Sequence, residues 1–583
     1  MPDTTGGEVI ARMLQAEGVE KVFGIIDGTY FGFYSALHAL GIEIVTPRHE
    51  TSAAHMAGAY ARLTGRLGVC MASNGPGVAN LLPGLAVEQA EGNRVLAVTS
   101  ARRAGVMYPD RIGTYQCFDQ QGTIAKLAKW SCAVPAFERI PEIVRRALRK
   151  SWEGRPGVVH VDVPESLMNS RVKADVTCWA PHQYRRTHPT AAPADAVVRA
   201  AEMLAAARLP LIHAGSGVIH AGAYDELARV AELLHAPVTT SWAARGVLSE
   251  DSPLAVPMVH VKLCHRMRND ADAVLIVGSR LGETDWWGKA PYWRRPSQQK
   301  TVQVDIDGEI LGQHKPVELG VLADAKVFLA ALAAELERRG AGDAGPRREA
   351  LARYRDQMRR DRERWDRALT ERQAPMNPAH VAHACAEVFP PDTVQVADGG
   401  NAAVWAMFHT RVRVPNTLLS TFKFGMLGAG VAQALGAAVA RPDKRVVCIT
   451  GDGAMGFHPQ EIETAIRNRL PVVYVVLCDK QWGMVKMNQQ FMLRPWKTLI
   501  MKSLGPEETI NADLGEIAFD KLAAAMGAHG ERVADPAALR GALERARDAG
   551  RCAVVHVDVD PVKHLWAPGL IHFKKMHEEP SGR

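Results

Sequence analysis

Two aspartates, each placed directly after a short apolar run, have the spacing that most strongly indicates chemistry. Asp452 follows residues 445–450 within Gly451-Asp452-Gly453-Ala454, and Asp479 lies just after residues 471–477. Helical spacing between the runs predicts a strand–helix–strand unit, whose right-handed crossover places both carboxylates at one sheet edge. Two carboxylates beside a glycine-rich turn suit Mg²⁺ that holds a diphosphate. The alternative is an ordinary turn with two solvated acids.

Length and composition limit the kind of protein that the 583 residues can form. With 47% hydrophobic residues the chain can bury several cores, and no apolar run is long enough to span a membrane. The N-terminus lacks a signal-peptide pattern, and the nine cysteines include no CxxC pair, so we expect a cytoplasmic protein with reduced thiols and no membrane partner. The net charge of +7 permits an anionic substrate but, without a dense basic helix, does not indicate nucleic acid.

Strands alternate with helices along most of the chain, which predicts an α/β protein with three doubly wound parallel-sheet domains. In the middle domain, Gly215-Ser216-Gly217 and Gly278-Ser279-Arg280 follow predicted strands, so a nucleotide is a possible ligand of a Rossmann-like unit. The linkers are a Pro/His/Thr-rich segment and a strongly charged, solvated helix. The tail is either a frayed end or a flap over a site. The expected parts are domains 1–180, 194–340 and 375–560, linkers 181–193 and 338–372, and the tail 561–583.

Over nearly its whole length the chain resembles the thiamine-diphosphate-dependent enzymes of the acetolactate synthase, pyruvate oxidase and 2-hydroxyacyl-CoA lyase group. The family motif is Gly-Asp-Gly followed, about two dozen residues later, by Asn-Asn. Here Asp479 stands where the last Asn is expected, and Cys478 replaces the other. The resemblance implies that Asp452, Asp479 and the Gln481 carbonyl bind Mg²⁺. Aspartate in place of asparagine keeps an oxygen ligand and adds a negative charge.

The resemblance also implies how thiamine diphosphate is held. The segment Phe424-Gly425-Met426-Leu427-Gly428 matches the one that grips the aminopyrimidine. In it, the Gly425 carbonyl accepts from the 4′-amino group and Leu427 is the wedge that bends the cofactor. Ala402 stands where the family often has a histidine, so diphosphate binding depends more on backbone groups. The remaining expected cofactor contacts of this domain are Gly400, Asn401, Gly453, Ala454, Trp482, Gly483 and Met484.

A catalytic acid is implied in the first domain. Pro47-Arg48-His49-Glu50 matches the family's Arg-His-Glu segment, in which the glutamate faces N1′ of the pyrimidine and promotes loss of the C2 proton. Taken alone, Glu50 is a surface acid at the start of a helix. Gly75-Pro76-Gly77 with Asn80 resembles another cofactor-binding turn, and Tyr115-Gln116 resembles a Phe-Gln pair in which Gln116 contacts substrate.

In this family the acid and the metal motif belong to different subunits, so the resemblance implies a homodimer or homotetramer with interface sites. The middle domain binds FAD or an ADP or CoA moiety in some relatives and nothing in others. The implied reaction is carbon–carbon cleavage or ligation through a thiazolium ylide and a carbanion, and the fold does not choose the substrate. Departures at Ile26-Asp27-Gly28 and in residues 486–497 favour a 2-hydroxyacyl-CoA lyase-like enzyme over an acetolactate synthase-like one acting on a 2-keto acid. The alternatives are an FAD-containing pyruvate oxidase-like enzyme and a non-catalytic regulatory homologue.

Overall fold

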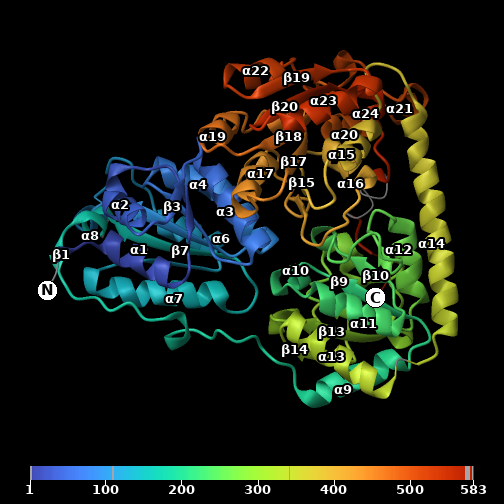
Figure 1. The fold of residues 1–583 in the computed structure, drawn as a ribbon, viewed down its shortest axis with the longest axis horizontal. Helices are drawn as coiled ribbons and strands as arrows, with labels where there is room; N and C mark the ends of the chain where they lie inside the picture. Colours follow the sequence, from blue (N-terminus) through green and yellow to red (C-terminus); the bar gives the residue numbers. More distant parts are fainter. Residues whose placement is uncertain (1–2, 108–110, 341, 571–577, 581, 583) are drawn as a thin grey trace.

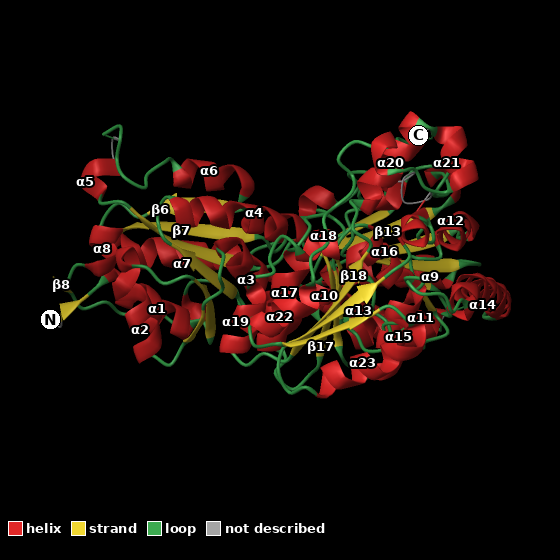
Figure 2. Ribbon diagram, turned by 90° about the horizontal axis from the view of Figure 1, so that it is seen from above, coloured by secondary structure: helices red, strands yellow, loops and turns green. Residues whose placement is uncertain are grey.

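Three sheets of six parallel strands organise the molecule, so the predicted α/β fold with three parallel-sheet domains is confirmed (Figure 1). The computed structural model describes residues 3–107, 111–340, 342–570, 578–580 and 582. Helices cover both faces of each sheet, as Figure 2 shows, which explains why the central strands are continuous apolar runs. Among the described residues, no helix is long and apolar enough to cross a membrane.

The N-terminal domain has the strand order β3-β2-β4-β5-β7-β6. Helices α1, α2 and α7 share one core with the sheet, and α3, α4 and α6 share the core on the other side. An antiparallel pair, β1 with β8, lies outside the sheet. The strands are β1 (Asp3–Thr4), β2 (Lys21–Gly24), β3 (Glu43–Val45), β4 (Gly68–Ala72), β5 (Val95–Ala101), β6 (Trp130–Ala133), β7 (Val158–Pro164) and β8 (Val172–Lys173). The helices are α1 (Gly6–Ala16), α2 (Phe31–Ala39), α3 (Glu50–Thr64), α4 (Pro76–Glu91), α5 (Ala104–Met107), α6 (Gln120–Leu127), α7 (Ile140–Trp152) and α8 (Glu165–Asn169).

The middle domain has the order β11-β10-β9-β12-β13-β14, and the charged stretch after it forms the long helix α14 that runs along one side of the molecule in Figure 1. The strands are β9 (Pro210–Ala214), β10 (Val238–Thr240), β11 (Ala255–Val256), β12 (Ala273–Val277), β13 (Lys300–Asp305) and β14 (Leu319–Leu322). The helices are α9 (Ala194–Ala205), α10 (Gly217–Ala221), α11 (Tyr224–Leu234), α12 (Val261–Asp270), α13 (Ala325–Arg339) and α14 (Gly345–Asp366).

The C-terminal domain has the order β16-β15-β17-β18-β20-β19, and its β17 and β18 are the two strands expected around the aspartates. The strands are β15 (Val394–Ala397), β16 (Leu418–Ser420), β17 (Val446–Gly451), β18 (Val472–Cys478), β19 (His529–Val533) and β20 (Ala553–Asp558). The helices are α15 (Ala379–Val388), α16 (Asn401–His409), α17 (Ala429–Ala440), α18 (Asp452–Met455), α19 (Glu461–Arg467), α20 (Gly483–Leu493), α21 (Pro495–Met501), α22 (Phe519–Ala525), α23 (Pro536–Asp548) and α24 (Pro561–Leu565).

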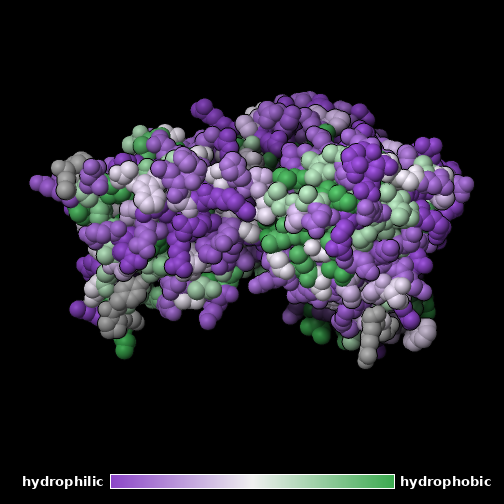
Figure 3. Space-filling model, turned by 90° about the horizontal axis from the view of Figure 1, so that it is seen from below, coloured by the Kyte–Doolittle hydropathy of each residue, from purple (hydrophilic) through white to green (hydrophobic). Residues whose placement is uncertain are grey.

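Helices α3 and α17 join the first and third domains within one chain. Both are rich in small residues, and a Cβ on Gly436 of α17 would lie only 2.4 Å from the Met56 carbonyl oxygen of α3. The small side chains therefore let the two helix backbones approach closely, and their residues share one hydrophobic core. On the face seen in Figure 3 most of the surface is hydrophilic, and hydrophobic side chains gather in one area near the centre of the molecule.

Each sheet reverses its direction of growth near its centre, and ligands of such sheets bind at the carboxyl ends of the strands beside that point. The reversal lies between β2 and β4, between β9 and β12, and between β15 and β17. The loops that follow these strands contain the glycine-rich and acidic residues singled out from the sequence. The topology therefore gives each domain one candidate ligand edge.

Candidate active site

The first cluster lies at the carboxyl edge of the third sheet, where the loops after β15, β17 and β18 meet. Asp452 begins α18 and accepts hydrogen bonds from the amides of Gly453 and Lys480, each at 2.7 Å. Asp479 follows β18 and accepts from Gln481 Nε2 at 3.0 Å and from His564 Nδ1 at 2.6 Å. The structure thus brings the two aspartates together, as their spacing predicted. We call this set the anchor half-site.

Electrostatics mark the anchor half-site as a place that favours positive charge. Burial, and then the nearby charge of Asp479, raise the pKa of Asp452 to about 6, and the two amides that donate to it oppose that shift. Lys480, between Asp479 and Gln481, has a φ of 59°, in the left-handed region that a lysine rarely adopts. Strained turns of this kind are typical of functional sites.

The second cluster lies at the edge of the first sheet and contains the expected catalytic acid. Glu50 is the first residue of α3, and its Oε2 accepts from Asn80 Nδ2 at 3.1 Å. Gly75 adopts a φ of 68° in the turn before α4, where a Cβ would lie 2.6 Å from the Gln116 carbonyl oxygen. Glu50, Gly75, Asn80 and Gln116 therefore gather in one place, which we call the acid half-site.

The expected pyrimidine-gripping segment lies between β16 and α17. Gly425 adopts a φ of 75°, and its amide donates to the Thr421 carbonyl at 2.6 Å. The Gly425 backbone is exposed, and Leu427 is half-buried. In the described part of the chain, no hydrogen bond or ion pair joins this segment or the anchor half-site to Glu50.

Comparisons with known proteins agree with this arrangement of edges. Three models of the thiamine pyrophosphate enzyme match the chain in order: the N-terminal TPP binding domain at residues 4–123, the central domain at 197–332 and the C-terminal TPP binding domain at 398–557. The chain belongs to the thiamine pyrophosphate enzymes. Within that family it falls in the acetolactate synthase group.

The similar proteins include three large subunits that align along nearly their full lengths. The probable acetolactate synthase large subunit of Methanococcus aeolicus is 27% identical over 96% of this chain and 93% of its own. The isozyme 2 large subunit of Escherichia coli is 29% identical over 96% of both chains. The acetolactate synthase large subunit IlvG of Mycobacterium tuberculosis is 31% identical over 95% of this chain and 96% of its own.

A thiamine pyrophosphate enzyme must hold a diphosphate, and the anchor half-site has the polar groups for one. Asn401 is 3% exposed, yet its Oδ1 and Nδ2 both lack a hydrogen-bond partner among the residues that the structure describes. Buried polar atoms are almost always paired, so a bound ligand explains this pair of atoms. A Cβ on Gly483 would lie 2.8 Å from Asn401 Nδ2 and 3.6 Å from Asp479 Oδ2, which places all three residues around one space.

The other expected residues of this thiamine pyrophosphate enzyme surround the same space. A Cβ on Gly400 would lie 3.2 Å from Met484 Cβ, and one on Gly453 would lie 2.8 Å from the Trp482 ring. Ala454 is buried in the first turn of α18. Glycine at 400 and 453 thus leaves room for the Met484 and Trp482 side chains to pack directly against the backbone.

The donor set fits Mg²⁺ with a diphosphate. In the described part of the chain, no group of three or more His, Cys, Asp or Glu side chains could hold a metal ion. A cation between Asp452 and Asp479 therefore needs oxygens from the backbone and from the ligand, which is the coordination that Mg²⁺ prefers. The Gln481 carbonyl accepts from the Gly483 amide at 2.9 Å and keeps a second lone pair.

Sequence reasoning missed His564 and Gln120. His564 lies in α24, where it holds Asp479 and where its carbonyl accepts from Trp405 Nε1 at 3.0 Å. Gln120 is 2% exposed; its Oε1 accepts from the Gly75 amide at 3.2 Å and its Nε2 donates to Asp162 at 2.6 Å. The expected tail residues 571–577 lie outside the described part of the chain. The described tail before them is packed, with His564 4% and Leu570 5% exposed.

Proposed function

We propose that this chain is a carbon–carbon carboligase or lyase that binds thiamine diphosphate through Mg²⁺ and acts on a 2-keto acid. The observation that carries the proposal is the pair of neighbouring carboxylates, half-buried Asp452 and buried Asp479, beside Asn401. The buried Oδ1 and Nδ2 of Asn401 have no hydrogen-bond partner in the described part of the chain. The names of the similar proteins support the substrate class, since all three are acetolactate synthase subunits.

Each residue of the anchor half-site has a task in this proposal. Asp452, Asp479 and the Gln481 carbonyl hold Mg²⁺, the Gly453 amide holds Asp452 in place, and Asn401, at the N-terminus of α16, contacts the diphosphate. Gly425 and Leu427 orient the pyrimidine. When bound, thiamine diphosphate supplies an electron sink for making or breaking a bond to a carbonyl carbon.

Glu50 has the task of holding a proton at the pyrimidine N1′. Asn80 occupies one oxygen of the carboxylate, and the other lies beside Gly77, where a Cβ would be 3.4 Å away. This arrangement fixes the side chain and leaves one oxygen for the ring nitrogen. A carboxylate that is held and partly exposed can exchange that proton during turnover.

The separation of the two half-sites supports a homodimer or homotetramer with interface sites. Glu50 contacts Asn80 near the first turn of α4, whereas Lys423 Nζ contacts the Ala90 carbonyl at the last turn. Eleven residues of helix separate Asn80 from the end of α4, which is about 16 Å. Glu50 and Gly425 must flank one ring, so the second chain brings the missing half to each site.

Exposed apolar side chains at both half-sites also support a partner chain. Near Gln116, Tyr115 is 74% exposed and Ile112 is 90% exposed. Near the pyrimidine-gripping segment, Phe424 is 46% exposed and Phe457 is 52% exposed. Apolar groups rarely gather on a surface that stays in water. Burying them against the opposite half-site accounts for their positions.

A cavity of about 520 Å³ at the edge of the middle sheet supports a nucleotide there, either FAD or an ADP or CoA moiety. A Cβ on Gly215 would lie 2.1 Å from the Gly278 carbonyl oxygen, so the two glycine turns let backbones meet at the point where the sheet reverses. Arg155 and Arg280 line the cavity and offer charge to phosphates. FAD would give a yellow preparation, which also tests the oxidase alternative.

Replacing Glu50 with Gln tests the proposed chemistry. We expect the variant to lose product formation and the C2 hydrogen–deuterium exchange of added thiamine diphosphate, while calorimetry still detects Mg²⁺ and cofactor binding. Mass spectrometry of products from pyruvate, other 2-keto acids and 2-hydroxyacyl-CoA thioesters identifies the reaction. Unchanged turnover in E50Q refutes the role of the acid, and product formation from thioesters alone refutes the substrate class.

A further inference from the structure

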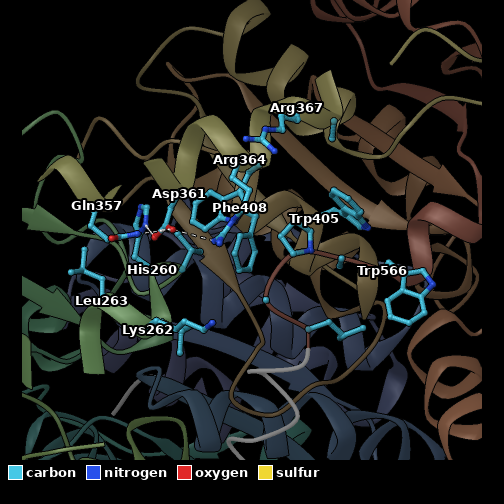
Figure 4. A pocket seen from close by; sticks show the side chains of 18 of the residues that line it. His260, Lys262, Leu263, Gln357, Asp361, Arg364, Arg367, Trp405, Phe408 and Trp566 are labelled. Atoms are coloured by element: carbon cyan, nitrogen blue, oxygen red, sulfur yellow. Dashed lines mark hydrogen bonds and ion pairs between the residues drawn. The ribbon is translucent and has the colours of Figure 1, made fainter. Parts of the chain in front are cut away.

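A second large cavity, of about 750 Å³, lies where the middle domain, helix α14 and the C-terminal domain meet (Figure 4). We call it the α12–α14 cavity. Its walls come from the start of α12, the last turns of α14, α16, α20 and the tail after α24. Ligand pockets for small molecules have about 300–1,000 Å³. The cavity therefore has the size of a ligand site, and none of the residues proposed for cofactor binding lines it.

The rim of the α12–α14 cavity carries positive charge without matching acids. Lys262 and Arg266 stand one turn apart on α12, and Arg367 lies on the opposite side, after α14; all three are exposed. In the described part of the chain, none of the three forms an ion pair. The two acids of the lining are engaged, since Asp361 contacts His260 and Arg364, and Glu371 contacts Lys563.

Aromatic rings form the interior of the cavity. Trp405 and Phe408, from α16, border it together with Trp566, as Figure 4 shows, and Trp365 also lines it. Trp405 and Phe408 are 5% and 3% exposed, whereas Trp365 and Trp566 are half-exposed. The Trp365 and Phe408 rings meet edge to face, with centroids 4.9 Å apart. Flat aromatic walls suit a planar base, which can stack on such rings.

Cations on two opposite elements favour a ligand with several negative charges over a single carboxylate. The ligand that matches both features has a planar base and more than one phosphate charge. Met484 at the anchor half-site and Phe491 at the cavity lie on the same helix, seven residues or about 10 Å apart. A ligand bound in the cavity can therefore reach the proposed reaction centre only through a long, flexible substituent.

We propose that the α12–α14 cavity binds the phosphorylated adenosine of a ligand that is either a free nucleotide or the end of coenzyme A. The planar base lies against the half-exposed rings of Trp365 and Trp566, and the phosphates face Lys262, Arg266 and Arg367. The coenzyme A source rests on the proposed carbon–carbon chemistry and adds to it a thioester as a second reactant beside the 2-keto acid. The free nucleotide is independent of that function.

Calorimetry of the chain loaded with Mg²⁺ and thiamine diphosphate tests the proposal, with coenzyme A and ADP as separate probes. The double substitution Lys262→Ala/Arg266→Ala should weaken binding about tenfold, because the phosphates lose two cationic partners. Arg353→Ala/Arg355→Ala, which removes two exposed cations of α14 outside the cavity, should leave it unchanged. Arg280→Ala should weaken binding of a probe only if the probe binds in the middle-domain cavity, which Arg280 lines.

Each possible binding result either supports or overturns the proposal. Binding of coenzyme A but not ADP, lost in K262A/R266A, supports the thioester source, and equal binding of both probes supports a free nucleotide. Absence of binding by both probes at millimolar concentration overturns the proposal. An equal loss of affinity in the R353A/R355A control also overturns it, as does a loss of affinity that is confined to R280A. Because no turnover is measured, and E50Q should bind the probe as the unmodified chain does, failure here is distinct from failure of the proposed function.

Discussion

Replacing His564 with leucine perturbs the anchor half-site without changing the volume of the buried side chain greatly. The His564 and Asp479 side chains are 4% and 2% exposed, and the 2.6 Å contact between them is one of two side-chain hydrogen bonds to the carboxylate. Removing one partner of a buried acid costs on the order of 3 kcal/mol, because the remaining charge stays out of water. Asp452 nearby adds like charge and increases that cost.

The loss of stability in His564→Leu should be smaller when Mg²⁺ is bound. For a domain of about 180 residues, 3 kcal/mol corresponds to a fall of about 6–12 °C in the thermal transition. Mg²⁺ with thiamine diphosphate compensates Asp479 directly, so the deficit of His564→Leu should shrink by at least half when both are present. Differential scanning calorimetry with and without Mg²⁺ and cofactor measures this difference.

The matched control is His564→Gln, which keeps a donor near Asp479 and should lose much less stability. A deficit in His564→Leu that is the same size with and without Mg²⁺ and cofactor refutes the reasoning. That result means either that no cation binds at Asp479 or that α24 stabilises the domain through packing alone.

Two further predictions concern Asn401 and Asp162. Without cofactor, Asn401→Ala should leave the stability unchanged or raise it, because the substitution removes unpaired buried polar atoms. The same substitution should weaken thiamine diphosphate binding, and a loss of stability without cofactor contradicts this reasoning. Burial raises the pKa of Asp162 from 3.8 to about 7, so the folded chain keeps a proton that the unfolded chain loses. The stability from this group is fully present below about pH 4 and is lost as the pH rises to 7. Asp162→Asn should therefore remove this part of the pH dependence of the unfolding free energy, measured by urea unfolding between about pH 4.5 and 7.5. An unchanged pH dependence contradicts the assignment.

The sequence was sufficient to predict β17, β18 and the two aspartates of the anchor half-site. β17 and β18 are buried on both faces, so they appear as continuous apolar runs, and parallel pairing places Asp452 and Asp479 at one edge. The edge strands gave no such signal. β14 is apolar but only four residues long and alternates buried and exposed positions, and β19 is mostly half-exposed and has no apolar run.

Contacts between distant segments could not be predicted from local pattern. His564 lies 85 residues from Asp479, and only packing of the tail against α16 and α20 brings them together. One local signal was available, since Asp560 and Pro561 form a capped helix start. The separation of Glu50 from Gly425 also depends on how α3 packs on α17, which pattern alone does not determine.

The central claim is that each active site takes Glu50 from one chain and the Asp452–Asp479 anchor from another. Complementation between Glu50→Gln and Asp452→Ala chains tests it most directly, with C2 hydrogen–deuterium exchange of added thiamine diphosphate as a readout that needs no substrate. Each variant alone should be inactive. Random mixing of refolded or co-expressed chains should restore about a quarter of the unmodified exchange activity, because half of the dimers are mixed and each has one intact site. A mixture of folded, associated chains that is no more active than its parents contradicts the account.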